Sequence, residues 1–333
     1  MPSSEALVRV EGLVKHFPVP AGRFPRGARV RAVEDVGFEI RRGEVLALVG
    51  ESGSGKSTVG KLLLRLIEPT SGRITFDGTP LTDLGRRSMR TMRRRMQMIF
   101  QDPYSSLNPH LRIGAALEEP LLIHGLSGDA RKRRDRVAEL LQTVGLPESA
   151  ASRYPHEFSG GQRQRIGIAR ALAVEPEFIV ADEAISALDV SNQAQVLNVL
   201  SELRQRSEQA MLFISHNMAV VRNFADRVAV LYLGRLMEIA PAESLFRNPR
   251  HPYTAALLDA VPVPDPLANL DKQLLQGDIP SPIDPPSGCV FRSRCPRAID
   301  ACAAGVPPLQ ELGPGHRVAC IRSLPDTEGR HAA

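Results

Sequence analysis

The sequence contains no tryptophan, and aromatic residues make up only 5% of its 333 residues. Proteins that bind single-stranded nucleic acids stack the bases on aromatic side chains, and this chain has few of them. We therefore expect no nucleic-acid partner despite a net charge of +5. Only five of the 42 basic residues are lysines, and we attribute this arginine excess to coding bias. The arginine clusters at 86–95 and 131–134 are interpreted as solvated helix faces rather than as surfaces for nucleic acid or anionic lipid.

Long apolar runs are also absent. The longest, such as 45–50, are far short of the roughly 18 residues of a membrane span. The N-terminus, MPSSEALVRVEG, lacks the basic and apolar segments of a signal peptide. We therefore expect a chain that is neither secreted nor membrane-spanning and that reaches a membrane only through a partner.

Cysteine is confined to the C-terminal part, with the spacing C-x5-C-x6-C-x17-C, at Cys289, Cys295, Cys302 and Cys320. The last 83 residues also hold 13 of the 27 prolines. Composition thus predicts a small loop-rich domain over 251–333 after a larger domain over 1–250. In a reducing compartment, four thiolates suit zinc or a [4Fe–4S] cluster better than two disulfides. The C-x2–4-C pairs common in zinc folds are missing, and free thiols remain a third possibility.

One glycine-rich segment matches the phosphate-loop pattern G-x-x-x-x-G-K-[ST] at every fixed position. It follows a predicted strand at 44–49 and opens a predicted helix at 57–67, the context that the pattern requires. Lys56 is expected to reach the β- and γ-phosphates of a nucleotide, and the Ser57 hydroxyl to bind Mg²⁺. The candidate phosphate-binding residues are Gly50, Glu51, Ser52, Gly53, Ser54, Gly55, Lys56, Ser57 and Thr58.

Two adjacent acids end a predicted buried strand at 178–181. Asp182 is placed to hold Mg²⁺ through water, and Glu183 to orient or deprotonate the attacking water. Further strands at 211–215 and 228–233 alternate with helices at 160–173 and 192–206. This alternation predicts an α/β core with a mainly parallel sheet.

The segment Phe158-Ser-Gly-Gly-Gln162, which lies between the loop and the acids, resembles the signature motif of ABC-type ATPases. The order of the other motifs also resembles that family over residues 5–250: the phosphate loop, Gln101, the signature, Asp182–Glu183, Ser186–Asp189 and Ser215-His216. The resemblance implies a RecA-like core sheet, an antiparallel β subdomain and a helical signature subdomain at about 102–176.

The resemblance also implies roles for single residues. Phe17 would stack on adenine, Gln101 would contact Mg²⁺ or water and sense the γ-phosphate, and His216 would touch the γ-phosphate. ATP would lie between two subunits, so the signature residues would act on the partner's nucleotide: Ser159, Gly160, Gly161 and Gln162. Asp189 would help to shape the dimer interface beside the nucleotide. Two positions depart from the family pattern, Ala184-Ile185 after the acids and Asn217 after His216, but neither removes a catalytic group.

Three segments are similar to the oligopeptide/dipeptide importer subgroup: Gln101–Pro109, Asn248–Thr254, and the four-cysteine tail, which resembles the dipeptide type. This implies a second ATPase subunit, identical or paralogous, two membrane permease subunits, an extracytoplasmic binding protein, and a place on the cytoplasmic face of the inner membrane. Tyr104–Leu107 would receive the permease. Subgroup members with similar cysteines carry an iron–sulfur cluster, so we favour [4Fe–4S] over zinc. An importer for another small solute such as a metal chelate, a soluble ATPase acting on nucleic acid or the ribosome, and a non-catalytic iron–sulfur module remain alternatives.

Overall fold

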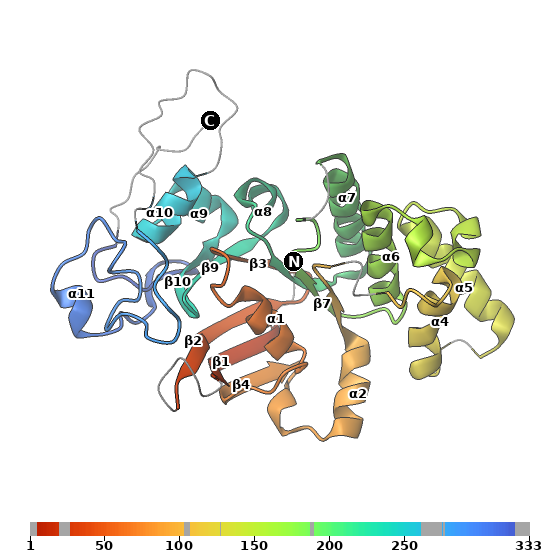
Figure 1. Ribbon diagram of the computed structural model, residues 1–333, viewed down its shortest axis with the longest axis horizontal. Helices are drawn as coiled ribbons and strands as arrows, with labels where there is room; N and C mark the ends of the chain where they lie inside the picture. Colours follow the sequence, from red (N-terminus) through yellow and green to blue (C-terminus); the bar gives the residue numbers. More distant parts are fainter. Residues whose placement is uncertain are drawn as a thin grey trace, which may run out of the picture. The chain divides into compact units, whose positions relative to one another are not determined.

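The computed structural model of the chain describes residues 5–19, 27–102, 107–126, 128–186, 190–260, 275 and 277–323. The chain divides into two compact units, whose helices and strands are labelled in Figure 1. The first unit comprises Met1–Leu7, Ile40–Glu44 and Asp77–Ile214, and the second comprises Val8–Glu39, Val45–Phe76 and Ser215–Ala333. Each unit therefore joins segments that are far apart in the sequence.

Three parallel strands form the sheet of the first unit: β6 (Met96–Ile99), β7 (Phe178–Asp182) and β8 (Ala210–Ile214). Every residue of β7 and β8 is buried, as expected for continuous apolar strands in a parallel sheet. Phe178 pairs with Met96 on one side and Ala210 on the other, so the carboxyl ends of the strands meet at one edge. Asp182 lies at that edge.

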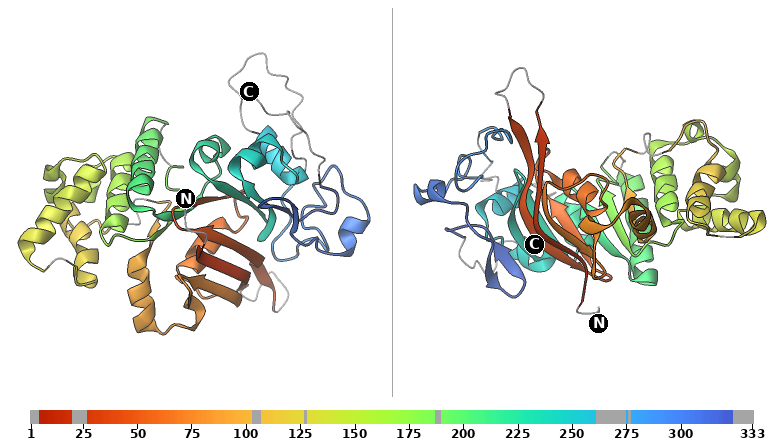
Figure 2. Two further views of the ribbon diagram at one scale, coloured as in Figure 1. Left: turned by 180° about the vertical axis from the view of Figure 1, so that it is seen from behind. Right: turned by 90° about the horizontal axis from the view of Figure 1, so that it is seen from below.

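A helical bundle belongs to the same unit. Its helices α4 (Ile113–Ile123), α5 (Ala130–Thr143) and α6 (Gly160–Leu172) pack against one another, and they lie together in both views of Figure 2. Pro120 lies inside α4, where a proline would normally break or kink the helix. In the structure α4 continues through Pro120, because burial of Leu117 and Leu121 offsets the one backbone hydrogen bond that proline removes. The helix ends before Gly125, which adopts a left-handed φ of 64°.

The remaining elements of the first unit are short, except for two helices. They are β5 (Thr79–Pro80), η1 (Leu81–Asp83), α2 (Arg86–Arg95), η2 (Glu148–Ser152), η3 (Pro155–Glu157) and α7 (Val190–Ser207). Helix α2 buries only Met89, so its arginines lie on a largely solvated face, as predicted.

An ion-pair network links two segments of the first unit, Ile40–Glu44 and Asp77–Ile214. Arg42 bonds Glu177 at 2.9 Å and Asp77 at 2.5 Å, and Arg95 bonds the same two carboxylates. The Arg95 guanidinium, assisted by Arg42, holds the pKa of Asp77 and the pKa of Glu177 below their ordinary values.

Two sheets lie in the second unit. Strands β1 (Ala6–Pro18), β2 (Arg29–Arg41) and β4 (Ser71–Phe76) form an antiparallel sheet in the order β2-β1-β4. The other sheet has the order β11-β12-β10-β9-β3, and its strands are β3 (Val45–Val49), β9 (Arg227–Tyr232), β10 (Arg235–Pro241), β11 (Gln310–Gly313) and β12 (His316–Val318). Only β3 and β9 pair in parallel; the other neighbours are antiparallel.

The second unit has five helices in its described part, α1 (Lys56–Leu63), α8 (Met218–Phe224), α9 (Ala242–Arg247), α10 (Pro252–Asp259) and α11 (Ala301–Ala304). The C-terminal strand β12 pairs with β10, so the proline-rich tail contributes a strand to the sheet that also contains β9 and β3. A domain boundary near residue 250 stays a prediction. No helix in the described part of the chain combines the length and apolarity that crossing a bilayer requires.

Candidate functional site

The phosphate loop connects β3 to α1 and follows a path that only glycine permits at two positions. Gly50 has a φ of 149°, and a Cβ there would lie 2.1 Å from the carbonyl oxygen of Leu231. Gly55 has a φ of 104°, and its Cβ would lie 2.2 Å from the carbonyl oxygen of Ala32. The loop therefore curls close to neighbouring backbone and opens directly into a helix N-terminus, which favours an anion.

Lys56 is the cation of this loop. Its side chain is buried, and Nζ donates to the carbonyl oxygens of Gly50 at 2.9 Å and Glu51 at 2.8 Å. These neutral acceptors hold the ammonium over its own loop. A phosphate oxygen is a stronger, charged acceptor than these carbonyls, and the predicted role of Lys56 relies on that difference.

Two further predicted residues belong to the second unit. Phe17 on β1 is 36% exposed, and Lys15 Nζ lies 4.9 Å from its ring centroid. His216 is exposed just before α8. Asn217, the departure from the family pattern, caps α8 by accepting from the backbone N–H groups of Ala219 and Val220. Asparagine thus supplies the cap oxygen that an aspartate would supply.

The acids belong to the first unit. Asp182 is buried at the end of β7, and Glu183 adopts a left-handed φ of 46°. Its N–H donates to the Ile214 carbonyl at 3.0 Å, and its carbonyl accepts from Ser186 N–H at 3.1 Å. The Glu183 carboxylate accepts from the Gln101 amide at 2.8 Å. The fold thus brings together two predicted catalytic residues and holds one of them in a strained conformation of the kind that gathers at functional sites.

The signature segment begins α6, as predicted. Ser159 is the N-cap: its Oγ accepts from Gln162 N–H at 3.3 Å, while Ser159 N–H donates to Gln162 Oε1 at 3.0 Å. This capping box fixes where the helix starts and leaves the Gly160–Gly161 backbone at its N-terminus. Asp189 lies outside the described residues.

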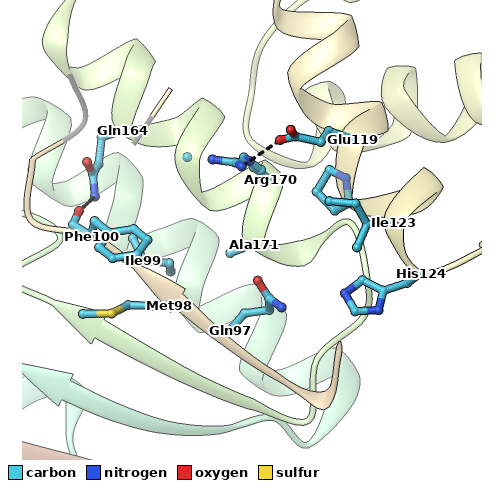
Figure 3. Close-up of a pocket in the computed structure, with 12 residues that line it drawn as sticks. Gln97, Met98, Ile99, Phe100, Glu119, Ile123, His124, Gln164, Arg170 and Ala171 are labelled. Carbon is cyan, nitrogen blue, oxygen red and sulfur yellow. Dashed lines mark hydrogen bonds and ion pairs between the residues drawn. The ribbon is translucent and has the colours of Figure 1, made fainter. Parts of the chain in front are cut away.

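A groove of about 220 Å³ lies between β6, α4 and α6 in the first unit (Figure 3). Phe100 and Ile123, two of its lining residues, are 42% and 48% exposed. Figure 3 shows Arg170 of α6 paired with Glu119 of α4, at 2.9 Å. Burial, with Arg90 and Arg94, lowers the pKa of the lining residue His124.

The predicted receiving surface, 104–107, differs from this groove. Tyr104, Ser105 and Ser106 lie outside the described residues, and Leu107 is buried at 3% exposure. Leu107 therefore packs in the interior and cannot serve as an exposed contact. Sequence reasoning missed the groove, because its walls come from three separate segments that carry no common motif.

The four cysteines line one small cavity of about 10 Å³, which is room for about one water molecule. All four are free thiols, and burial raises the pKa of Cys289, Cys295 and Cys320. Among the described residues, no three His, Cys, Asp or Glu side chains are close enough to share a metal ion. The four cysteines thus share one cavity, but as placed they form no ligand group and give no evidence for an iron–sulfur cluster.

Comparison with known proteins identifies two family regions. Residues 33–186 match the ABC transporter family, and residues 237–302 match the oligopeptide/dipeptide transporter C-terminal region. A putative peptide import ATP-binding protein of Brucella ovis is 58% identical over 316 residues, covering 95% of this chain and 98% of that protein. The oligopeptide transport ATP-binding protein AppF of Bacillus subtilis is 47% identical over 322 residues, covering 96% and 98%.

The fold agrees with these matches. The ABC transporter cassette MJ0796, in a dimeric post-hydrolysis state bound to ADP and Pi, is similar with a TM-score of 0.64 and 29% identity, covering 71% of this chain and 98% of that one. The predicted α/β fold with an antiparallel β subdomain is confirmed. The chain therefore belongs to the ABC transporter ATPases, which bind ATP with Mg²⁺ and hydrolyse it, and within them to the ATP-binding proteins of the oligopeptide/dipeptide transporter subgroup.

Proposed function

We propose that this chain is one of two ATPase subunits that power the import of short peptides, of the dipeptide type. The main support is the match of residues 237–302 to the C-terminal region of the oligopeptide/dipeptide transporters, in a chain whose phosphate-loop motif is intact. The names of the relatives, peptide import and oligopeptide transport proteins, support the same cargo class.

Each predicted site residue is assigned one role toward the nucleotide. Gly50–Thr58 cradles the phosphates, and Lys56 transfers from its loop carbonyls to the β- and γ-phosphates. Phe17 stacks on the adenine. When bound, Mg²⁺ neutralises charge on the phosphate oxygens. Its holders would be Ser57, Gln101 and Asp182, whose oxygen atoms suit a hard cation.

Hydrolysis is assigned to Glu183 as general base. A water oxygen attacks the γ-phosphorus while the bond to the β–γ bridging oxygen breaks, and the water's proton passes to the Glu183 carboxylate. The Gln101 amide, 2.8 Å from that carboxylate, keeps it oriented. His216 is assigned the contact with the γ-phosphate.

The signature helix serves the partner's nucleotide. Ser159, Gly160, Gly161 and Gln162 present the N-terminus of α6, whose amides and dipole favour the γ-phosphate of an ATP bound to the other subunit. Asp189 would shape the same interface. The dimeric cassette structures of MJ0796 support a paired arrangement.

We place the permease in the groove of the first unit. Phe100 and Ile123 line it and offer exposed apolar surface of the kind on which an amphipathic helix of a membrane subunit can pack. The chain would then lie on the cytoplasmic face of the inner membrane and work with two permease subunits and an extracytoplasmic binding protein.

The four cysteines are proposed to hold a metal centre, with a [4Fe–4S] cluster favoured over zinc. What supports this is the shared cavity, its soft thiol ligands, and three arginines that also line it, Arg292, Arg297 and Arg322. The thiols as placed do not form a ligand group, so binding requires them to rearrange. Iron and zinc analysis of anaerobically purified protein decides: about four irons per chain confirms the cluster, and stoichiometric zinc replaces it.

The cargo is tested with the complete transporter in proteoliposomes that contain ATP. Labelled dipeptides, pentapeptides and a metal chelate are offered separately with the cognate binding protein. Accumulation of dipeptide by the wild type, and none by Glu183→Gln, is expected. Uptake of the chelate alone would refute the peptide cargo while leaving the ATPase assignment intact.

A further inference from the structure

The C-terminal tail contacts the phosphate loop directly, at Glu51. Arg294, which precedes Cys295, makes a bidentate ion pair with the Glu51 carboxylate, with Nη1–Oε2 at 2.6 Å and Nη2–Oε1 at 3.1 Å. Tyr253 of α10 accepts a hydrogen bond from the Glu51 backbone N–H at 3.0 Å. Residues more than 200 positions away therefore hold both the side chain and the backbone of this loop residue.

Both contacts come from a rigid setting. The Arg294 side chain is only 6% exposed, and Tyr253 is fully buried. The rings of Tyr232, Tyr253 and Phe291 pack together with centroids 4.7 to 5.3 Å apart. Arg294 lies against this cluster, with its Cζ 5.9 Å from the Tyr232 ring centroid. Packing thus limits how far the guanidinium can swing from Glu51, unlike a solvent-exposed ion pair.

Glu51 also accepts a hydrogen bond from the side chain of Lys56. The Glu51 carbonyl accepts from Lys56 Nζ at 2.8 Å, so three groups of one residue are fixed: the amide by Tyr253, the carboxylate by Arg294 and the carbonyl by Lys56. A shift of Glu51 would therefore move both the loop backbone and the resting position of the phosphate-binding lysine.

We propose that Arg294 and Tyr253 are positioning residues for the nucleotide: they hold Glu51 so that the phosphate loop is already shaped for ATP. The inference rests on the proposed phosphate-binding role of this loop. Because coupling between sites is reciprocal, ATP binding must in turn stabilise the tail around Arg294. The tail is thus a working part of the ATP site and not only an appendage for partners.

The test measures the dissociation constant for Mg-ATP in the full-length protein. The variants are Arg294→Gln, Glu51→Gln and their combination, with Arg247→Gln as control. Arg247 also pairs with a glutamate, Glu243 at 2.8 Å, but on the exposed surface of α9. We expect each single variant to weaken ATP binding about tenfold, or about 1.4 kcal/mol. The double variant should be no weaker than the worse single one, and the control should equal the wild type.

A second measurement needs no variant. Amide hydrogen exchange of the wild type, with and without Mg-ATP, should show slower exchange at 288–296 when nucleotide is bound. Unchanged exchange at these residues would overturn the inference. So would Arg294→Gln binding ATP within twofold of wild type despite a lower melting temperature, because the ion pair would then contribute to stability alone. Lys56→Ala separates the two claims: if it still binds ATP normally, the loop assignment itself fails.

Discussion

Replacing Glu183 by glutamine tests the proposed chemistry most directly. The substitution keeps the size of the side chain and an oxygen that can accept from Gln101, so the 2.8 Å contact survives as a neutral hydrogen bond. The loss of stability should therefore stay below about 1 kcal/mol. What disappears is the proton acceptor, and general-base catalysis contributes about 10²–10⁴-fold. We expect the ATPase rate to fall by that factor, or about 2.7–5.5 kcal/mol in the barrier, with ATP binding unchanged or tighter.

The assay is steady-state phosphate release with a parallel measurement of ATP affinity. Glu175→Gln is the matched control, since Glu175 is another glutamate of the first unit with a left-handed φ, 52°, and it pairs with Arg136 on the surface. That variant should hydrolyse ATP at the wild-type rate. If Glu183→Gln retained more than a tenth of the wild-type rate, Glu183 would not be the base.

Three more predictions follow from single contacts. Gly50→Ala should cost about 3 kcal/mol or more in urea unfolding and abolish ATP binding, because its Cβ would meet a backbone oxygen at 2.1 Å. Gly53→Ala, with a φ of 76° but nothing within 4 Å, should cost only about 1–2 kcal/mol. The two carboxylates paired with Arg95 have lowered pKa values, so their stabilisation is present above about pH 4.5 and is lost as the pH falls further. Arg95→Gln should therefore lower the free energy of unfolding in urea by about 1 kcal/mol at pH 7 and by less at pH 3.5. An equal difference between wild type and variant at both pH values would contradict this. Ile123→Glu should weaken co-purification with the permease without changing ATP affinity, whereas Leu122→Glu, next to it but outside the groove lining, should not. Equal loss in both would argue against the groove as the docking site.

Local features of the site could be predicted from the sequence. The spacing of glycines around Lys56 determines a curled loop, because only glycine tolerates the backbone conformations and close approaches at Gly50 and Gly55. The Ser159-x-x-Gln162 pattern predicts the start of α6 by capping, which is also a local interaction. The four-residue apolar run before Asp182 predicts β7, since a strand buried on both faces needs no alternation.

The sequence alone thus determined the chemistry of this protein: a phosphate loop, a pair of acids and a signature segment, each defined by neighbouring residues. Only the tertiary structure decided which distant residues meet. It joined Gln101 to Glu183, built the groove from β6, α4 and α6, added β12 to the sheet beside β10, and set Arg294 on Glu51. Such contacts depend on strand register and packing over hundreds of residues. A lone arginine in a proline-rich tail carries no local pattern that indicates its partner.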